Sequence, residues 1–210
     1  MNKQSKKVLI IKSSPAAEHS VSNEIADFLV TLLEDKDQQY DISIRDLAKE
    51  PAPVYDSEIL NAFYTPPEQL SARQKAISAP SLTYIEELKA ADIVVFASPM
   101  HNFSITTLLK AYIDQICRMG LTFRYHADGP EGLVKGKQAL IIGSAGGDFR
   151  QESQQHKDFQ TPYLKHVLHF IGIEDISVIP VQGLGMGEEV AALAKQTAKD
   201  QLKQLAASEL

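Results

Sequence analysis

Three short segments carry polar or glycine residues directly after apolar runs, which is where buried parallel strands end. The first is Ser13–Ser20, which follows the apolar run 7–12 and leads into a helical pattern. It places Ser14, Ser20 and Ser22 around the expected start of that helix. The first N–H groups of a helix lack internal partners and favour an anion, so a single phosphate suits this loop. The same serines are ordinary helix caps, so both interpretations stand.

The second segment is Pro99–Phe103, which follows the apolar run 92–97. It supplies the thioether of Met100, the amide of Asn102 and the ring of Phe103, which together suit the edge and face of a flat heterocycle. His101 stands among them, where it could bind a ligand, deliver a proton or only fill space.

The third segment is Ser144–Gly147, with Ala145 and Gly146 between its ends. Paired glycines let backbone N–H groups approach a ring closely. The glycine fingerprint of a dinucleotide loop is absent after the first apolar run, and so is the Gly-Lys-Ser/Thr of a triphosphate loop. The three segments together predict a site for one phosphate joined to a planar ring, which describes FMN.

Five strand-like runs separated by helical patterns must position these segments. The runs begin near residues 7, 40, 92, 138 and 176. This alternation predicts an α/β fold, a three-layer sandwich with a five-stranded parallel sheet of order 2-1-3-4-5, in one domain spanning 1–210. In such sheets the ligand lies beyond the carboxyl ends of the strands, where the strand order reverses.

The pattern also makes local predictions that the structure can test. They are an irregular segment Leu47–Pro67, a capped helix from Ser71 interrupted at Pro80, a helix Thr106–Met119 closed by Gly120, a loop or hairpin Leu121–Gly136, a cap at Thr161, and a last helix whose apolar face includes Val190 and Leu193.

The composition excludes several classes of function. A net charge of -6 argues against binding nucleic acid, whose phosphates attract basic surfaces. No apolar run approaches the roughly 20 residues of a membrane helix, and the short basic N-terminus does not have the form of a signal peptide. The single cysteine, Cys117, excludes an internal disulfide and a cysteine-rich metal site, and we expect a cytoplasmic protein.

Several motifs, taken in order and at compatible spacing, make the chain resemble the FMN-dependent NADH azoreductases, a branch of the flavodoxin-like quinone reductases. The matching stretches are Lys12–Ser14, Ser20–Asn23, Pro99–Phe103, Thr122–Tyr125, Gly129–Leu133, Ser144–Gly147 and Phe170–Ile173. The chain departs from the family pattern at His101, where tyrosine is common, at Ala145, where a larger polar or basic residue occurs, and in a long loop Asp148–Gln160.

The resemblance implies roles for individual residues. Ser14, Ser20, Val21 and Ser22 would hold the FMN phosphate. The residues from Pro99 to Phe103 and from Ser144 to Gly147 would hold the isoalloxazine, and Tyr125 and Phe170 would line the substrate pocket. It also implies NADH or NADPH as donor, a quinone or azo compound as acceptor, ping-pong hydride transfer carried by FMN without a catalytic side chain, and a homodimer with FMN at the interface.

Other functions compete with this one. A flavodoxin-type electron carrier would bind FMN without turning over a small substrate, and an interaction protein could keep the fold without the cofactor. The glycines of 183–187 are more typical of a loop than of a dinucleotide motif, because they follow the last strand. Ser144 lacks the first glycine of a nucleophile elbow, and His166 and His169 lack partners for a metal site, so no metal is expected.

Overall fold

The protein, described here from a computed structural model, has residues 5–35 and 40–208 in defined positions. A five-stranded parallel sheet forms its centre, in the order β2-β1-β3-β6-β7. The strands are β1 (Lys6–Lys12), β2 (Tyr40–Asp46), β3 (Ile93–Pro99), β6 (Gln138–Ala145) and β7 (Asp175–Gln182). The α/β class and the five parallel strands are confirmed. The labels depart from the expected 2-1-3-4-5 because β4 and β5 form a separate hairpin between the third and fourth strands along the chain.

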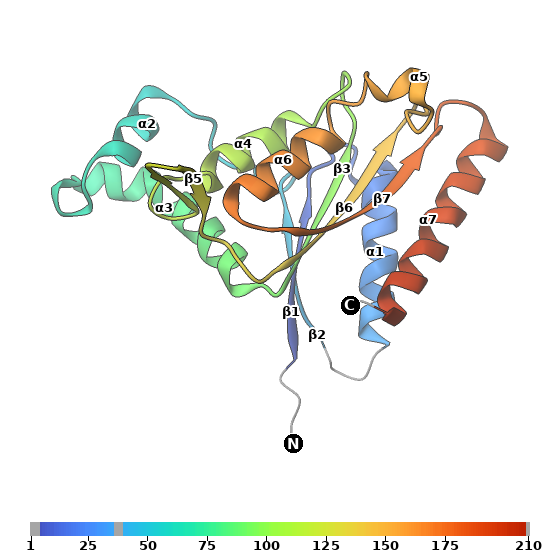
Figure 1. Cartoon of the computed structure of the whole chain (residues 1–210), viewed down its shortest axis with the longest axis horizontal. Helices are drawn as coiled ribbons and strands as arrows, with labels where there is room; N and C mark the ends of the chain where they lie inside the picture. The colour runs from blue at the N-terminus through green and yellow to red at the C-terminus, as the bar shows by residue number, and fades with distance from the viewer. Residues whose placement is uncertain (1–4, 36–39, 209–210) are drawn as a thin grey trace.

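Helices cover both faces of the sheet (Figure 1). On one face, α1 (Val21–Glu34) and α7 (Glu188–Ser208) pack with Val8 and Ile10 of β1. On the other face, α3 (Ala72–Ala90), α4 (Thr107–Ile116) and α6 (Thr161–Ile171) pack with Leu9 and Ile11. Alternate residues of one strand therefore serve two cores, which explains why the central residues of β1, β3 and β6 form continuous apolar runs.

The apolar face predicted for the last helix is partly wrong. Val190 and Leu193 are exposed, whereas the buried residues of α7 are Ala194, Ala198, Leu202 and Ala206. These recur every four residues and are mostly small, so α7 packs along a narrow stripe against α1 and β7. Leu193 lies outside that stripe.

Two expectations about helices differ from the structure. Pro80 does not interrupt α3, which runs continuously from a capping box between Ser71 and Gln74. A proline removes one N–H from the helix, and here the buried contacts of Tyr84 and Leu88 on the sheet side hold the helix in place. The irregular segment contains α2 (Ser57–Tyr64), which is capped by the Asp56 side chain.

Helix α4 is shorter than expected, and Gly120 does not close it. It ends at Ile116, where the Thr122 hydroxyl donates to the Ile116 carbonyl at 2.6 Å and accepts the Arg118 N–H at 3.0 Å. Gly120 lies in the following turn with φ of +79°. That turn leads into the hairpin of β4 (Phe123–His126) and β5 (Gly129–Gly132), one of the two forms expected for this segment.

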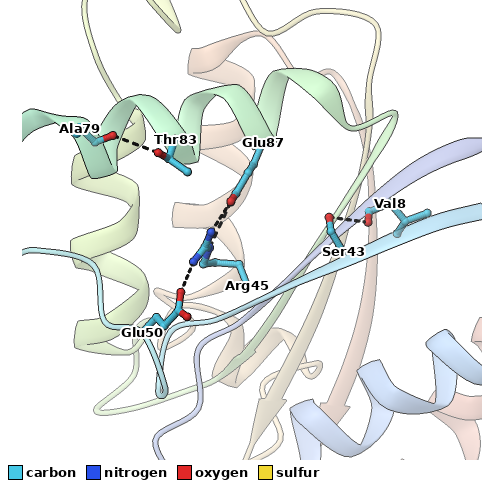
Figure 2. Close-up of polar contacts among 7 residues, drawn as sticks. All are labelled: Val8, Ser43, Arg45, Glu50, Ala79, Thr83 and Glu87. Atoms are coloured by element: carbon cyan, nitrogen blue, oxygen red, sulfur yellow. Dashed lines mark hydrogen bonds and ion pairs between the residues drawn. The ribbon is translucent and has the colours of Figure 1, made fainter.

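The edge strand β2 is tied to its neighbours by polar side chains (Figure 2). Arg45 forms ion pairs with Glu87 of α3 and with Glu50, the latter at 2.5 Å, and the Ser43 hydroxyl donates to the Val8 carbonyl of β1 at 3.3 Å. Charged residues on an exposed edge also discourage pairing with another chain. In the described part of the chain, no helix combines the length and apolarity needed to cross a membrane.

Candidate functional site

The three segments singled out in the sequence lie at one edge of the sheet, which we call the crest. Ser13, after β1, donates its N–H to the Ala97 carbonyl of β3 at 3.0 Å. Met100, after β3, donates its N–H to the Ser144 carbonyl of β6 at 2.6 Å. The loops after β1, β3 and β6 are therefore direct neighbours, as the parallel register requires.

The first crest loop carries buried hydroxyl groups beside the start of α1. Ser13, Ser14, Ser20 and Ser22 are all buried. The Ser20 hydroxyl accepts the Asn23 N–H at 3.3 Å and lies 3.1 Å from the Ser22 hydroxyl. Ser20 is thus the N-cap of α1, and the capping interpretation is confirmed. A role in binding phosphate is compatible with this position but stays a prediction, as does that of the half-buried Val21.

The second crest loop is a tight turn. His101 and Ser104 exchange backbone hydrogen bonds of 2.9 and 3.0 Å, and between them Asn102 and Phe103 have φ of 49° and 70°. Positive φ at both central residues is the type I′ arrangement. The side chains of His101, Asn102 and Phe103 are exposed, with Pro99 and Met100 half-buried behind them. The turn therefore presents an amide and a phenyl ring at the crest.

The third crest loop is supported from behind by the glycine-rich segment 183–187. The carbonyls of Ala145, Gly146 and Gly147 accept N–H groups from Leu184, Gly185 and Gly183 at 3.1, 2.8 and 2.8 Å. Across a trans peptide, the C=O of one residue and the N–H of the next point in opposite directions. The N–H groups of residues 146–148 therefore point away from the supporting segment.

Glycine is favoured in this supporting segment, which the sequence interpretation took for a plain loop. A Cβ on Gly185 would lie 3.3 Å from the Gly146 carbonyl oxygen, and Gly183 has φ of +84°. On the crest side, Gly146 and Gly147 are exposed, whereas Ser144 and Ala145 are buried. The spacing of the glycines was a usable signal, but only the fold shows which loop they contact.

Charge near the third loop is locally neutralised. Asp148 accepts hydrogen bonds from the Arg150 guanidinium at 2.8 and 2.6 Å, and this interaction lowers the pKa of the Asp148 carboxyl to about 2. The carboxylate next to Gly147 is therefore ionised and paired at neutral pH. An electron-rich ligand edge at this loop would meet the N–H groups without an unpaired negative charge beside them.

Tyr125 and Phe170 lie together, but in a separate aromatic cluster. The Phe123 ring lies 5.6 Å from Tyr125 and 4.6 Å from Phe170, between centroids. The Phe103 ring at the crest instead contacts the Phe149 ring, at 6.4 Å between centroids. The structure thus brings together the residues expected around the cofactor, and it groups the two expected substrate residues on the hairpin and α6.

The sequence interpretation missed the segment 158–160, which contacts the second crest loop. The Phe159 N–H donates to the Phe103 carbonyl at 2.9 Å, and the buried Gln160 side chain donates to the Ser98 carbonyl at 3.0 Å. Thr161 is the first residue of α6 rather than its cap, because Gln160 holds the N-cap position. A polar loop offered no sequence signal for this contact.

Two other chemistries have little support. Ser144 is buried, and its carbonyl rather than its side chain takes part in the crest contact with Met100. His166 and His169 are exposed on α6. Within residues 5–35 and 40–208, no group of three or more His, Cys, Asp or Glu side chains is placed to hold a metal ion.

Comparison with known proteins agrees with the fold. A family model described as the flavodoxin-like fold matches residues 6–206. The chain belongs to this flavodoxin-like family. It is 43% identical over 202 residues to an FMN-dependent NADH:quinone oxidoreductase of Escherichia coli O157:H7, covering 96% of this chain and 99% of that protein.

Two solved structures are similar in fold to this chain. An FMN-dependent NADH-azoreductase from Bacillus anthracis str. Ames Ancestor, crystallised in complex with FMN, has a TM-score of 0.86 and 26% identity, covering 96% of this chain and 99% of that one. An azoreductase from Bacillus anthracis str. Sterne has a TM-score of 0.87 at 21% identity, covering 97% and 99%, and this similarity concerns the fold alone.

Proposed function

We propose that this protein is an FMN-dependent NADH oxidoreductase that reduces quinones and azo compounds, built as one FMN-binding domain. The observation that carries the proposal is the crest itself. Buried hydroxyls at a helix start, an exposed amide and phenyl ring, and N–H groups beside exposed glycines lie on three adjacent loops. The likeness to a quinone oxidoreductase over nearly the whole chain supports the same cofactor and donor.

The residues at the crest fit the parts of FMN. Ser14, Ser20 and Ser22, with the first amides of α1, would bind the phosphate, since hydroxyl and N–H donors there face an end of the helix that favours negative charge. Met100 to Phe103 would contact the ring system. The N–H groups of Gly146 and Gly147 would stabilise negative charge at the edge of the ring.

The chemistry would be that of FMN, which when bound accepts hydride from NADH and passes it to a quinone or azo compound. The role of the chain is to bind FMN, to orient the donor and the acceptor against it, and to exclude water. His101, Asn102 and Phe103 are exposed, and we propose that the donor and then the acceptor bind beside them at the same face of the ring, in a ping-pong order. Cleavage of an azo bond needs four electrons, so it requires two such cycles.

We also propose a homodimer that completes the substrate pocket. In one chain, Tyr125 and Phe170 cluster around Phe123 rather than around Phe103 at the crest. Tyr64 on α2 and Met119 after α4 are exposed beside that cluster, and an interface would cover them. Pairing would let the aromatic cluster of one copy face the crest of the other.

Titration with FMN and with riboflavin, which lacks the phosphate, tests the site. Ser22→Ala should weaken FMN binding by about 10- to 150-fold, since a lost hydrogen bond to a charged group costs roughly 1.5–3 kcal/mol, and leave riboflavin binding unchanged. Ser81→Ala is the matched control, because Ser81 is equally buried but donates to the Gln115 carbonyl far from the crest. An equal loss of affinity for FMN and for riboflavin would contradict the assignment of Ser22 to the phosphate.

Stopped-flow mixing tests the reaction. The FMN-loaded protein should lose its yellow colour with NADH and regain it with menadione or an azo dye. A protein that binds FMN but is not reduced by NADH would be an electron carrier instead, and one that does not take up FMN would refute the proposal.

A further inference from the structure

The turn His101–Ser104 has a backbone that its own residues do not favour. Asn102, with φ of 49°, is a residue type that tolerates the left-handed region. Phe103, with φ of 70°, is not, because a bulky side chain clashes with the backbone there. Glycine would be usual at this place in a type I′ turn. Such a conformation persists only where the surroundings hold it, and it is often found at functional sites.

The segment between β6 and α6 supplies that hold. The Phe159 N–H donates to the carbonyl of Phe103 itself, at 2.9 Å. The Phe149 ring meets the Phe103 ring edge to face, at 6.4 Å between centroids and an interplanar angle of 77°. One contact fixes the backbone of the strained residue and the other fixes its side chain.

The segment is itself anchored in the sheet. The Gln160 side chain is 1% exposed, and its Nε2 donates to the Ser98 carbonyl at 3.0 Å. A Cβ on Gly143 of β6 would lie only 3.2 Å from the Gln160 Oε1. Because glycine has no Cβ, β6 leaves room for this amide. The Asp158 Oδ1 accepts the N–H groups of Gln160 and Thr161, both at 2.9 Å, which joins the segment to the start of α6.

We infer that Asp158–Gln160 is a brace that positions the turn His101–Ser104 for the cofactor ring. The brace connects the end of β3, the start of α6 and the strained residue Phe103, so the turn keeps its shape before any ligand arrives. Binding then does not have to order the turn, which lowers its cost. The inference rests on the proposed function, because it takes the crest to be the FMN site. None of these three residues touches the reacting atoms, so they act as positioning residues.

The brace can be tested without cofactor, by amide hydrogen exchange at residues 101–104 and 159. Gln160→Met keeps the length of the side chain but removes its donor, and Asp158→Ala removes the acceptor, whereas Asp158→Asn retains an oxygen there. We expect exchange of the His101 and Ser104 amides at least about fivefold faster in the first two variants, and near-normal exchange in the third. Unchanged exchange in Gln160→Met and Asp158→Ala would overturn the inference, whatever the chain binds.

Ligand titration then tests the link to the ring. Gln160→Met should weaken FMN and riboflavin by the same factor, roughly five- to tenfold, because the brace acts on the ring and not on the phosphate. Ser22→Ala should affect FMN alone, so the two parts of the site separate. Gln115→Ala is the matched control, since Gln115 is also fully buried and donates to a backbone carbonyl, that of Pro53, at 2.8 Å.

The outcomes distinguish this inference from the proposed function. If the unsubstituted chain fails to bind either flavin, the proposed function falls, while hydrogen exchange still decides whether the brace holds the turn. If Gln115→Ala lowers flavin affinity as much as Gln160→Met at a similar loss of melting temperature, the effect is one of general stability and the positioning role is refuted.

Discussion

Substituting Gly132 with alanine should separate the hairpin from α6. A Cβ on Gly132 would lie 2.1 Å from the Gly172 nitrogen and 2.3 Å from the Ile171 carbonyl carbon. Ordinary contacts between such atoms are about 3.5–4 Å, so the two backbones must move apart by more than 1 Å or so. Both partners are backbone atoms, which cannot turn aside as the end of a side chain can.

The size of the effect follows from what the movement breaks. The Val134 N–H donates to the Ile171 carbonyl at 2.8 Å, and the rings of Phe123 and Phe170 are 4.6 Å apart. Overpacking costs typically 1–3 kcal/mol, a lost hydrogen bond about 1 kcal/mol and a lost aromatic pair about 0.5–1.5 kcal/mol. Together they predict a loss of about 3–5 kcal/mol in the free energy of unfolding, measured by urea titration.

Gly129→Ala is the matched control on the same strand. A Cβ there meets nothing within 4 Å, but φ is +122°, so the variant reports only the cost of an unfavourable backbone, about 1–2 kcal/mol. If Tyr125 lines the substrate pocket as we propose, Gly132→Ala should also raise the KM for quinone, because Tyr125 lies on the displaced hairpin, and leave FMN affinity unchanged. A free energy of unfolding within about 1 kcal/mol of the Gly129→Ala value would refute this reasoning.

Three further predictions concern charge and burial. Hydrogen bonds from Lys135, then Arg124, lower the pKa of the Glu131 carboxyl to about 2, so the hairpin should keep its full stability above pH 4.5 and lose this contribution as pH falls toward 2. Urea titrations across that range should show a smaller loss in Glu131→Gln. Burial raises the pKa of the Cys117 thiol to about 12, so thiol reagents at pH 8 should modify it at least about a hundredfold more slowly than in the denatured chain. The Lys137 ammonium donates to two carbonyls at the C-terminal end of α3, at 2.6 and 2.5 Å. Lys137→Met should therefore lower the free energy of unfolding by about 1 kcal/mol. An unchanged free energy of unfolding would show that water fully replaces the ammonium at these carbonyls.

Much of the architecture was predictable, because strands buried on both faces and an N-cap at Ser20 are local signals. The capping box of Ser71 and Gln74 was predictable for the same reason. The continuous path of α3 through Pro80 was not, since the contacts of Tyr84 and Leu88 that compensate for the lost N–H come from distant segments. A single proline does not end a helix whose buried face is held by such contacts.

The candidate site, too, was predictable from the sequence only in part. The three crest loops could be placed because parallel strands end at a common edge. The supporting role of Gly183 and Gly185 could not, because it depends on which loop those glycines approach. The turn at Phe103 could not be predicted either, since the residue type argues against its backbone and only Phe159, far along the chain, explains it.

The support of residues 145–147 by residues 183–185 has a consequence for synthesis on the ribosome. The first crest loop, around Ser14, is synthesised early. The loop at Gly146 lacks the hydrogen bonds that support it until translation has passed Gly185. The nascent chain therefore completes this pocket only after residues 183–185 have been made. Truncated products that stop between residues 148 and 182 would carry every side chain of the three loops and still lack the segment that orients the amides of residues 146–148.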